Sequence, residues 1–342
     1  MKEKKIGYYF IVMASIIIVL AGVKSASDIL VPFLLSLFLA IILLPTYNFF
    51  NKKGVPESIS LVFVIGIFIV LILLVARLVG SSLHDFNADI NFYSEQMSVY
   101  YRSLAVFASK VGIEISVEEL SNLVNSKQIM SFVSNIMQSI GAMFTNSFVV
   151  LLTIIFMLLE SKNFQAKIAF AGKESDTVSR IEKISSQIKE YMVLKAIISM
   201  FTGFIVWVAL VIIGTDYAFL WAVVAFLFNF IPNIGSILAS VPPVLLSLVQ
   251  LGPLSALMVA LFYIVINLVI GSVVEPKLMG KGLGLSTLVV FLSLLFWGWL
   301  LGIVGMLLSI PLTIMVKIIL DKNEQTRWIS VLLGSGYDLK SK

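Results

Sequence analysis

The sequence of 342 residues contains no cysteine, a single histidine (His84) and few charged residues, which make up only 13% of the chain. Without cysteine the chain can form no disulfide, no thiolate nucleophile and no cysteine-based metal site. One histidine is too few for a histidine-rich metal centre, and no nucleophile–base pair stands out along the chain. The sequence therefore predicts no enzymatic activity, no catalytic residue, no bound metal and no cofactor.

Hydrophobic residues take the place of these missing groups and make up 59% of the chain. They are gathered into runs close to the ~20 residues that a helix needs to cross a bilayer. The net charge of +5 could indicate a nucleic-acid partner. The lysines, however, flank the apolar runs rather than forming a basic stripe, so we expect a lipid bilayer as a partner and no nucleic acid.

Runs with few charges mark the expected membrane spans and predict an all-α polytopic membrane protein of about eight spanning units. They cover residues 6–23, 28–47, 59–82, 139–160, 193–213, 218–230 with 237–250, 255–270, 286–296 and 301–320. The first run could also be a cleaved signal peptide, but an uncleaved helix is the simpler interpretation. Lysines and arginines in the short loops place both termini in the cytoplasm, provided that 218–250 and 286–320 each cross inward and outward as pairs of segments.

These runs divide the chain into regions. N-terminal membrane helices occupy residues 1–83, and an extracytoplasmic amphipathic helical segment occupies 84–138. A transport core follows over 139–320, with a cytoplasmic helix at 161–192, and a cytoplasmic tail covers 321–342. Apolar side chains recur every three or four residues in the extracytoplasmic segment, namely Phe86, Ile90, Tyr93, Met97, Tyr100, Leu104, Phe107 and Val111. This stripe must be buried either on the protein's own surface or on a neighbouring subunit.

An interruption lies inside the apolar run 218–250, where the chain reads Asn229-Phe230-Ile231-Pro232-Asn233-Ile234-Gly235-Ser236. Pro232 has no N–H and disfavours a continuous helix, and polar groups freed at membrane depth must find partners in the protein or in a cavity. Helices broken in this way form the substrate or ion site of many transporters. Asn229 and Asn233 lie four residues apart, so they could face one polar cavity or could only cap the broken helix ends.

A weaker copy of this pattern follows further along the chain. The pattern Phe226-Leu227-Phe228, a break, small residues and Ser240-Val241-Pro242 aligns with a second one. The second copy reads Leu295-Phe296-Trp297, a break at Gly298-Trp299 with Gly302 and Gly305, and Ser309-Ile310-Pro311. Two interrupted segments in corresponding positions indicate a transport site, although two leucine-rich stretches can also resemble each other by chance. We therefore expect broken or re-entrant helices in the C-terminal half.

Other residues at or near membrane depth complete the predicted site. Glu275 could bind a cation or proton, pair with Lys277 or another base, or form a solvated surface pair, and Lys195 is expected to snorkel to the interface. Trp297 and Trp299 could be interfacial belt residues or could line the cavity and stack on a solute. The predicted substrate-binding residues are Asn229, Pro232, Asn233, Gly235, Asn267, Glu275, Trp297 and Trp299.

Gly280, Gly282 and Gly284 lie in a glycine-rich connection between two apolar runs. The connection lacks the G-x-x-x-x-G-K-[ST] spacing of a phosphate loop, and no strand precedes it. We interpret the three glycines as a hinge between two membrane segments.

Several long motifs resemble one known family. They are Val31-Pro32-Phe33, Phe156-Met157-Leu158-Leu159-Glu160, Tyr191-Met192-Val193-Leu194-Lys195, and the stretches from Phe230 to Ser236, Glu275 to Ser286 and Gly302 to Leu312. Over nearly the whole chain, and most densely from 190 to 320, the sequence resembles the autoinducer-2 exporters. The resemblance implies a secondary transporter of the bacterial inner membrane, working in quorum sensing as a homo-oligomer, with a pentamer suspected.

The sequence thus predicts a secondary transporter that exports a small polar signalling molecule, with autoinducer-2 as the candidate. Some members of the resembling family are linked to exchange of sodium or lithium for protons, so an antiporter of that kind is the alternative. A membrane scaffold or sensor without transport is the third possibility, and the paired breaks argue against it.

Overall fold

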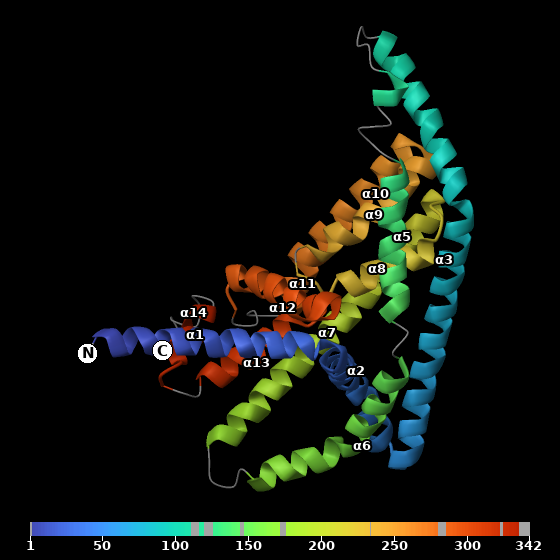
Figure 1. Cartoon of the computed structure of the whole chain (residues 1–342). Helices are drawn as coiled ribbons and strands as arrows, with labels where there is room; N and C mark the ends of the chain where they lie inside the picture. Colours follow the sequence, from blue (N-terminus) through green and yellow to red (C-terminus); the bar gives the residue numbers. More distant parts are fainter. Residues whose placement is uncertain are drawn as a thin grey trace. The chain divides into compact units, whose positions relative to one another are not determined.

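The computed structural model describes residues 2–110, 116–119, 126–143, 147–171, 176–232, 234–279, 285–321 and 324–334. Most of these residues are helical, and the described part contains no strand beyond a single bridge between Leu285 and Gly334 (Figure 1). Five described helices are long and apolar enough to cross a membrane, namely Ser27–Lys52, Glu57–Lys110, Ile188–Ile213, Pro253–Leu278 and Thr287–Leu307. The predicted all-α polytopic membrane fold is confirmed.

The chain divides into two compact units, each built from segments that lie far apart in the sequence. Unit 1 draws on residues 1–61, 148–193 and 281–342, and unit 2 draws on 62–147 and 194–280.

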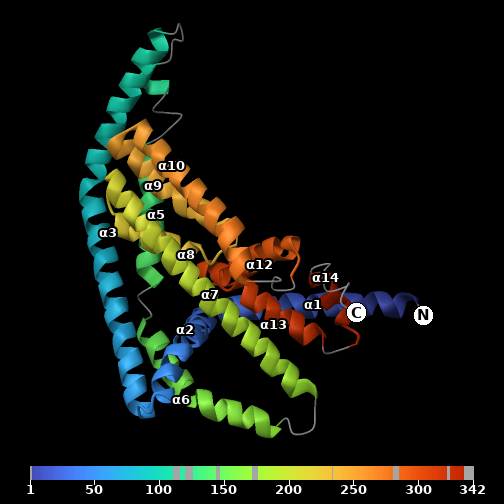
Figure 2. The ribbon, with the colours of Figure 1, turned by 180° about the vertical axis from the view of Figure 1, so that it is seen from behind.

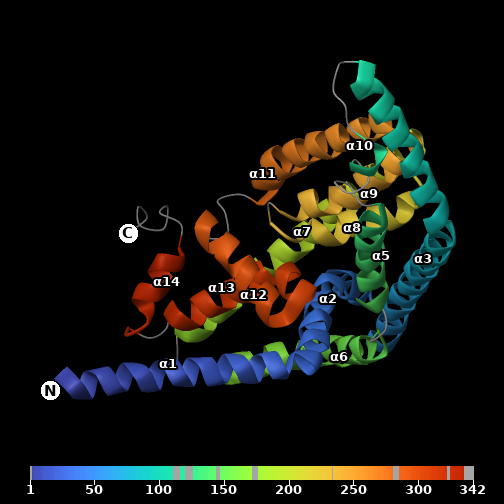
Figure 3. The same cartoon turned by 45° about the horizontal axis from the view of Figure 1, so that its top comes forward.

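Unit 1 contains α1 (Lys2–Ser25), α2 (Ser27–Lys52), α6 (Ser147–Ala171), α12 (Thr287–Leu307), α13 (Ser309–Asp321) and α14 (Arg327–Leu333). Within it α12 packs on α1, α2 and α13, and α14 packs on α13 (Figure 3). The buried hydroxyl of Ser36 lies 3.2 Å from the carbonyl oxygen of Val150 and so joins α2 to α6.

Unit 2 contains most of α3 (Glu57–Lys110), α5 (Ser126–Met143), the later part of α7 (Asp176–Ile213), α8 (Ala218–Phe228), α9 (Gly235–Leu251) and α10 (Pro253–Ile266). The last of these helices continues directly into a π-helix, η1 (Asn267–Val274), and then into α11 (Glu275–Met279). Helix α9 packs along both α8 and α10 (Figure 2).

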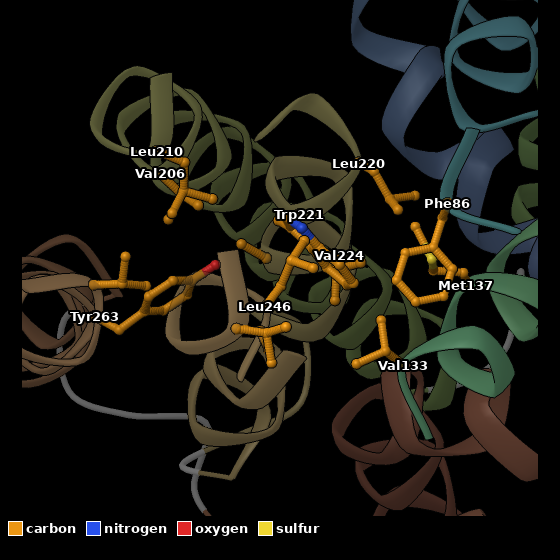
Figure 4. Packing of buried hydrophobic residues seen from close by; sticks show 14 of the residues in the cluster. Phe86, Val133, Met137, Val206, Leu210, Leu220, Trp221, Val224, Leu246 and Tyr263 are labelled. Atoms are coloured by element: carbon orange, nitrogen blue, oxygen red, sulfur yellow. The ribbon is translucent and has the colours of Figure 1, made fainter. Parts of the chain in front are cut away.

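The hydrophobic core of unit 2 gathers side chains from these helices around Trp221, Leu246 and Phe86 (Figure 4). In the predicted apolar stripe of α3, Phe86, Tyr93 and Met97 are buried in this cluster together with residues of α5. The stripe therefore packs on the protein's own helices. Phe107, in contrast, is 66% exposed, and Val111 lies outside the described residues.

Polar contacts fasten α3 to the turn between α7 and α8. The Tyr93 hydroxyl donates to the Asp216 carboxylate at 2.8 Å, and the Tyr217 hydroxyl donates to the Asp89 carboxylate at 3.1 Å. Burial raises the pKa of Tyr217 to about 12. Tyr217 itself adopts a left-handed backbone conformation, with a φ of 57°, at the start of α8.

Both predicted breaks exist, and the second is narrower than expected. In the first, α8 ends at Phe228 and α9 begins at Gly235, with Pro232 in the turn between them. In the second, Gly298 and Trp299 remain helical, and the backbone leaves the helical region at Gly302, where φ is 65° and ψ is −149°. Glycine adopts this backbone conformation more readily than other residues, which explains why the helix breaks at Gly302. Of the residues predicted for this break, Gly302 makes it, whereas including Gly298 and Trp299 was wrong.

Candidate functional site

The two breaks turn the chain back on itself and create two helical hairpins. The first hairpin, in unit 2, is α8 with α9 (218–251), which pack on each other. The second, in unit 1, covers 287–321 and turns at Gly302 within α12, so its second limb is the end of α12 with α13, and α12 packs on α13. Most predicted site residues lie in one of these hairpins or in the segment after α10.

The turn of the first hairpin is tight because Gly235 has no side chain. A Cβ at this position would overlap the carbonyl oxygen of Phe228, the last residue of α8. The Ile231 N–H donates to that same carbonyl at 2.8 Å and closes the turn, and Gly235 is buried. Gly235 and Pro232 therefore shape the hairpin. Asn233, the other predicted turn residue, lies outside the described residues.

Asn229 connects this turn to α7. Its side-chain N–H donates to the hydroxyl of Ser199 at 2.9 Å, and Ser199 is completely buried. The Asn229 side chain thus reaches a neighbouring helix. An amide also carries an acceptor oxygen and a second N–H, so the Asn229–Ser199 pair offers neutral donors and acceptors beside a helix break.

Four residues before Ser199 on α7, Lys195 forms an ion pair with Glu275. Their side-chain atoms lie 2.5 Å apart, and the two side chains are 3% and 23% exposed. The expected snorkelling of Lys195 was wrong, and Glu275 pairs with this distant base rather than in a solvated surface pair. A buried ammonium group needs such a partner, because its desolvation is otherwise uncompensated.

Asn267 is the first residue of the π-helix η1 and is half-buried. Its side-chain oxygen lies over Gly271, where an added Cβ would come within 3.1 Å of it. The π-helix separates Asn267 from Glu275, and π segments occur often at functional sites because the wider turn redirects side chains.

Trp297 and Trp299 belong to the second hairpin, in unit 1. The indole N–H of Trp297 donates to the Thr313 hydroxyl at 3.0 Å, which ties α12 to α13. Trp299 is 55% exposed, and the Lys24 ammonium lies 4.3 Å from the centre of its ring. Both side chains thus make contacts within unit 1. Their predicted stacking on a solute stays a prediction. The three predicted hinge residues, Gly280, Gly282 and Gly284, lie outside the described residues.

Sequence reasoning missed the contribution of α7. Lys195, Ser199 and Thr202 recur at intervals of four and three residues, and all three are buried although they are polar. Such spacing places side chains on one face of a helix. A search of the apolar run 193–213 for polar residues in helical register would have found this stripe.

A polytopic α-helical membrane protein with broken helices and buried polar groups beside the break has the architecture of a membrane transporter. Comparison with known proteins specifies the family. The model of the AI-2E family of transporters matches residues 11–325. The chain is 38% identical over 325 residues to the Escherichia coli AI-2 transport protein TqsA, covering 95% of this chain and 94% of that one.

Two further relatives agree with this assignment. A putative transport protein of Haemophilus influenzae is 40% identical over 335 residues, 96% of each chain. The putative transport protein YhhT of Escherichia coli is 33% identical over 325 residues, 95% of this chain and 93% of its own. The chain therefore belongs to the AI-2E transporter family, and it is a membrane transporter rather than an enzyme.

Proposed function

We propose that this protein is a secondary transporter that exports a small polar signalling molecule, with AI-2 as the leading candidate, across the bacterial inner membrane. The contact between Asn229 and Ser199 at the first break carries the proposal. It offers neutral hydrogen-bonding groups of the kind that suit an uncharged, hydroxylated solute. The name of the relative TqsA, an AI-2 transport protein, supports the choice of solute.

The proposal includes how the chain is organised. Both termini face the cytoplasm, residues 84–138 lie outside the membrane, residues 139–320 form the transport core, and Gly280, Gly282 and Gly284 act as its hinge. The working form is a homo-oligomer, with a pentamer as the specific expectation. Crosslinking of the purified protein in membranes would count the subunits, and accessibility of single introduced cysteines would locate the termini.

Efflux from proteoliposomes tests the proposed activity. Vesicles that contain the full-length protein and labelled AI-2 are compared with protein-free vesicles, with and without an imposed proton gradient. We expect protein-dependent release that responds to the gradient and that falls in Asn229→Leu. Release no faster than from protein-free vesicles, under both conditions, would contradict the proposal.

The ion pair of Lys195 with Glu275 favours a second candidate, a sodium or lithium/proton antiporter. A carboxylate that is largely removed from water can exchange a proton for a cation, provided that the ammonium partner moves away. The test is the proton gradient of everted vesicles, followed with a fluorescent dye. In an antiporter, added sodium or lithium collapses the gradient, and Glu275→Gln abolishes that response without changing the gradient itself.

A further inference from the structure

The hydroxyl of Tyr263 has no hydrogen-bond partner among the described residues, although Tyr263 is only 4% exposed. Tyr263 belongs to α10, and Figure 4 shows its oxygen directed toward the interior of the core cluster of unit 2. A buried hydroxyl without a partner destabilises the folded state. Phenylalanine would fill the same space without that penalty, so packing alone does not explain a tyrosine here.

Figure 4 shows apolar side chains of the cluster around Tyr263. Val206, Leu210 and Leu246 belong to the same cluster and offer no hydrogen-bonding side chain. Trp221 is also in the cluster, but its indole N–H already donates to the backbone carbonyl of Asp216 at 3.1 Å. No described group bonds the Tyr263 hydroxyl, so its hydrogen-bonding capacity is open to a molecule that enters this part of the core.

Helical periodicity links Tyr263 to the candidate site. On α10, Tyr263 lies one turn before Asn267, on the same face. On α7, the buried stripe that begins with Lys195, Ser199 and Thr202 continues in helical register to Val206 and Leu210, which share the cluster with Tyr263. The polar residues of this α7 face bond Glu275 and Asn229, and Tyr263 lies near its apolar continuation.

The chemistry of this position restricts what could occupy it. A charged group would lose its hydration among apolar side chains without a counter-ion nearby. A neutral hydroxyl, ether or carbonyl oxygen can accept a hydrogen bond from the phenol at much smaller desolvation penalty. The position therefore suits an oxygen atom of a neutral solute and not an alkali cation.

We propose that Tyr263 is a solute-binding residue of this transporter. Its hydroxyl donates a hydrogen bond to an oxygen atom of a small, neutral, hydroxylated solute that moves along the buried face of α7. The inference rests on the proposed transport function and adds to it a contact on α10 that the sequence pattern did not indicate.

The test is the variant Tyr263→Phe of the full-length protein, with AI-2 as the probe. Because the substitution removes an unpaired buried hydroxyl, we expect the melting temperature without AI-2 to rise. Because it also removes one hydrogen bond to the solute, we expect AI-2 to bind about tenfold more weakly, which corresponds to ~1.4 kcal/mol. Flux in proteoliposomes at low AI-2 concentration should fall accordingly.

Tyr93→Phe is the matched control. The Tyr93 ring is also buried in unit 2, but its hydroxyl is bonded to Asp216 at 2.8 Å. This variant should therefore melt at a lower temperature than the parent and bind AI-2 with unchanged affinity. Opposite shifts in stability for the two tyrosines, with a loss of affinity only at Tyr263, are the expected pattern.

Each other outcome overturns the inference in a distinguishable way. If the parent binds AI-2 and Tyr263→Phe binds it equally well, Tyr263 is no solute ligand, while the proposed function stands. A lower melting temperature of Tyr263→Phe would mean that the hydroxyl is already bonded, for example to a trapped water. If the parent protein neither binds nor carries AI-2, the proposed function and this inference fail together.

Discussion

The two helical hairpins reverse the chain with a similar glycine turn, but their polar side chains bond to different partners. In each, a glycine lets the turn approach the carbonyl of the aromatic residue in the first limb: Gly235 against Phe228, and Gly305 against Trp297. In the first hairpin the polar side chain at the turn, Asn229, bonds outward to α7. In the second, Trp297 bonds to Thr313 within the hairpin itself. The two hairpins therefore share a turn geometry, but the first is hydrogen-bonded to a neighbouring helix, and the second is hydrogen-bonded between its own limbs.

This comparison explains the weak internal similarity of the sequence. The aligned residues Phe228 and Trp297 supply the carbonyls, and the small residues that follow supply the close approach. The serines of the aligned Ser-x-Pro segments differ, because Ser309 is fully buried whereas Ser240 is only partly buried. Similarity of the backbone turn therefore does not extend to the environment of the side chains.

The largest effect should come from the ion pair beside the first hairpin. Lys195→Met leaves Glu275 without its partner, and breaking a buried pair on one side costs about 3–5 kcal/mol, toward the lower end here because Glu275 is partly exposed. Thermal unfolding in detergent measures the loss. Lys24→Met, which removes the cation over Trp299 beside the second hairpin, is the matched control and should cost less than about 1 kcal/mol. Equal losses of stability in Lys195→Met and Lys24→Met would show that the polar contacts beside the two hairpins do not differ in strength.

The second-largest effect is expected from the glycines of the two turns, and substituting either one should reduce stability by a similar amount. Gly235→Ala and Gly305→Ala each place a methyl group against a backbone carbonyl, so we expect each to lose about 2–3 kcal/mol of stability. The control is Gly298→Ala, whose Cβ would meet the flexible side chain of Met306 at 2.8 Å, which can move aside. Melting curves of the three variants decide the point. A stable Gly305→Ala protein would show that the second turn is not held by this approach.

Asn229→Leu should separate binding from folding. The variant loses its hydrogen bond to Ser199 and the groups it offers to a solute, so AI-2 affinity should fall about tenfold, or ~1.4 kcal/mol. Isothermal titration of the purified protein measures this affinity, and Ser240→Ala, in α9 of the same hairpin, serves as the control. Unchanged affinity in Asn229→Leu would remove the amide from the proposed solute site.

The smallest effect is expected at the closed hairpin. Thr313→Val keeps the shape of the side chain but removes the acceptor for the Trp297 N–H, which should cost about 1 kcal/mol of stability and leave AI-2 affinity unchanged. The same melting and titration experiments apply. A tenfold loss of affinity in Thr313→Val would bring the second hairpin into the solute site and weaken the comparison.

Features that depend on local residue chemistry were predictable from the sequence. The helical spans follow from apolar runs, and the first break follows from Pro232, which cannot take part in a continuous helix. The stripe from Phe86 to Met97 was also recognisable, because its spacing fixes one helix face whatever it packs against.

Features that depend on distant pairing were not predictable. Glu275 had several bases within reach in principle, and the choice of Lys195, 80 residues away in the chain, is set by how α7 meets the end of η1. The second break was predicted too broadly because Gly298, Gly302 and Gly305 all lie in one short stretch, and only the folded hairpin determines that Gly302 turns the chain. The π-helix was not predictable, since the mostly apolar run Asn267–Val274 continues the preceding α-helix without a helix-breaking residue such as proline.

The π-helix has a geometric consequence for the carboxylate that follows it. An α-helix advances about 100° per residue, so the extra residue taken up by a π turn rotates everything downstream by roughly that angle about the helix axis. The segment Asn267–Val274 therefore acts as an angular spacer between the faces of Tyr263 and Glu275. If it tightened to α-helical winding with α10 held fixed, Glu275 would swing about a quarter of a turn away from Lys195. The winding of this eight-residue segment thus sets the direction in which the carboxylate points.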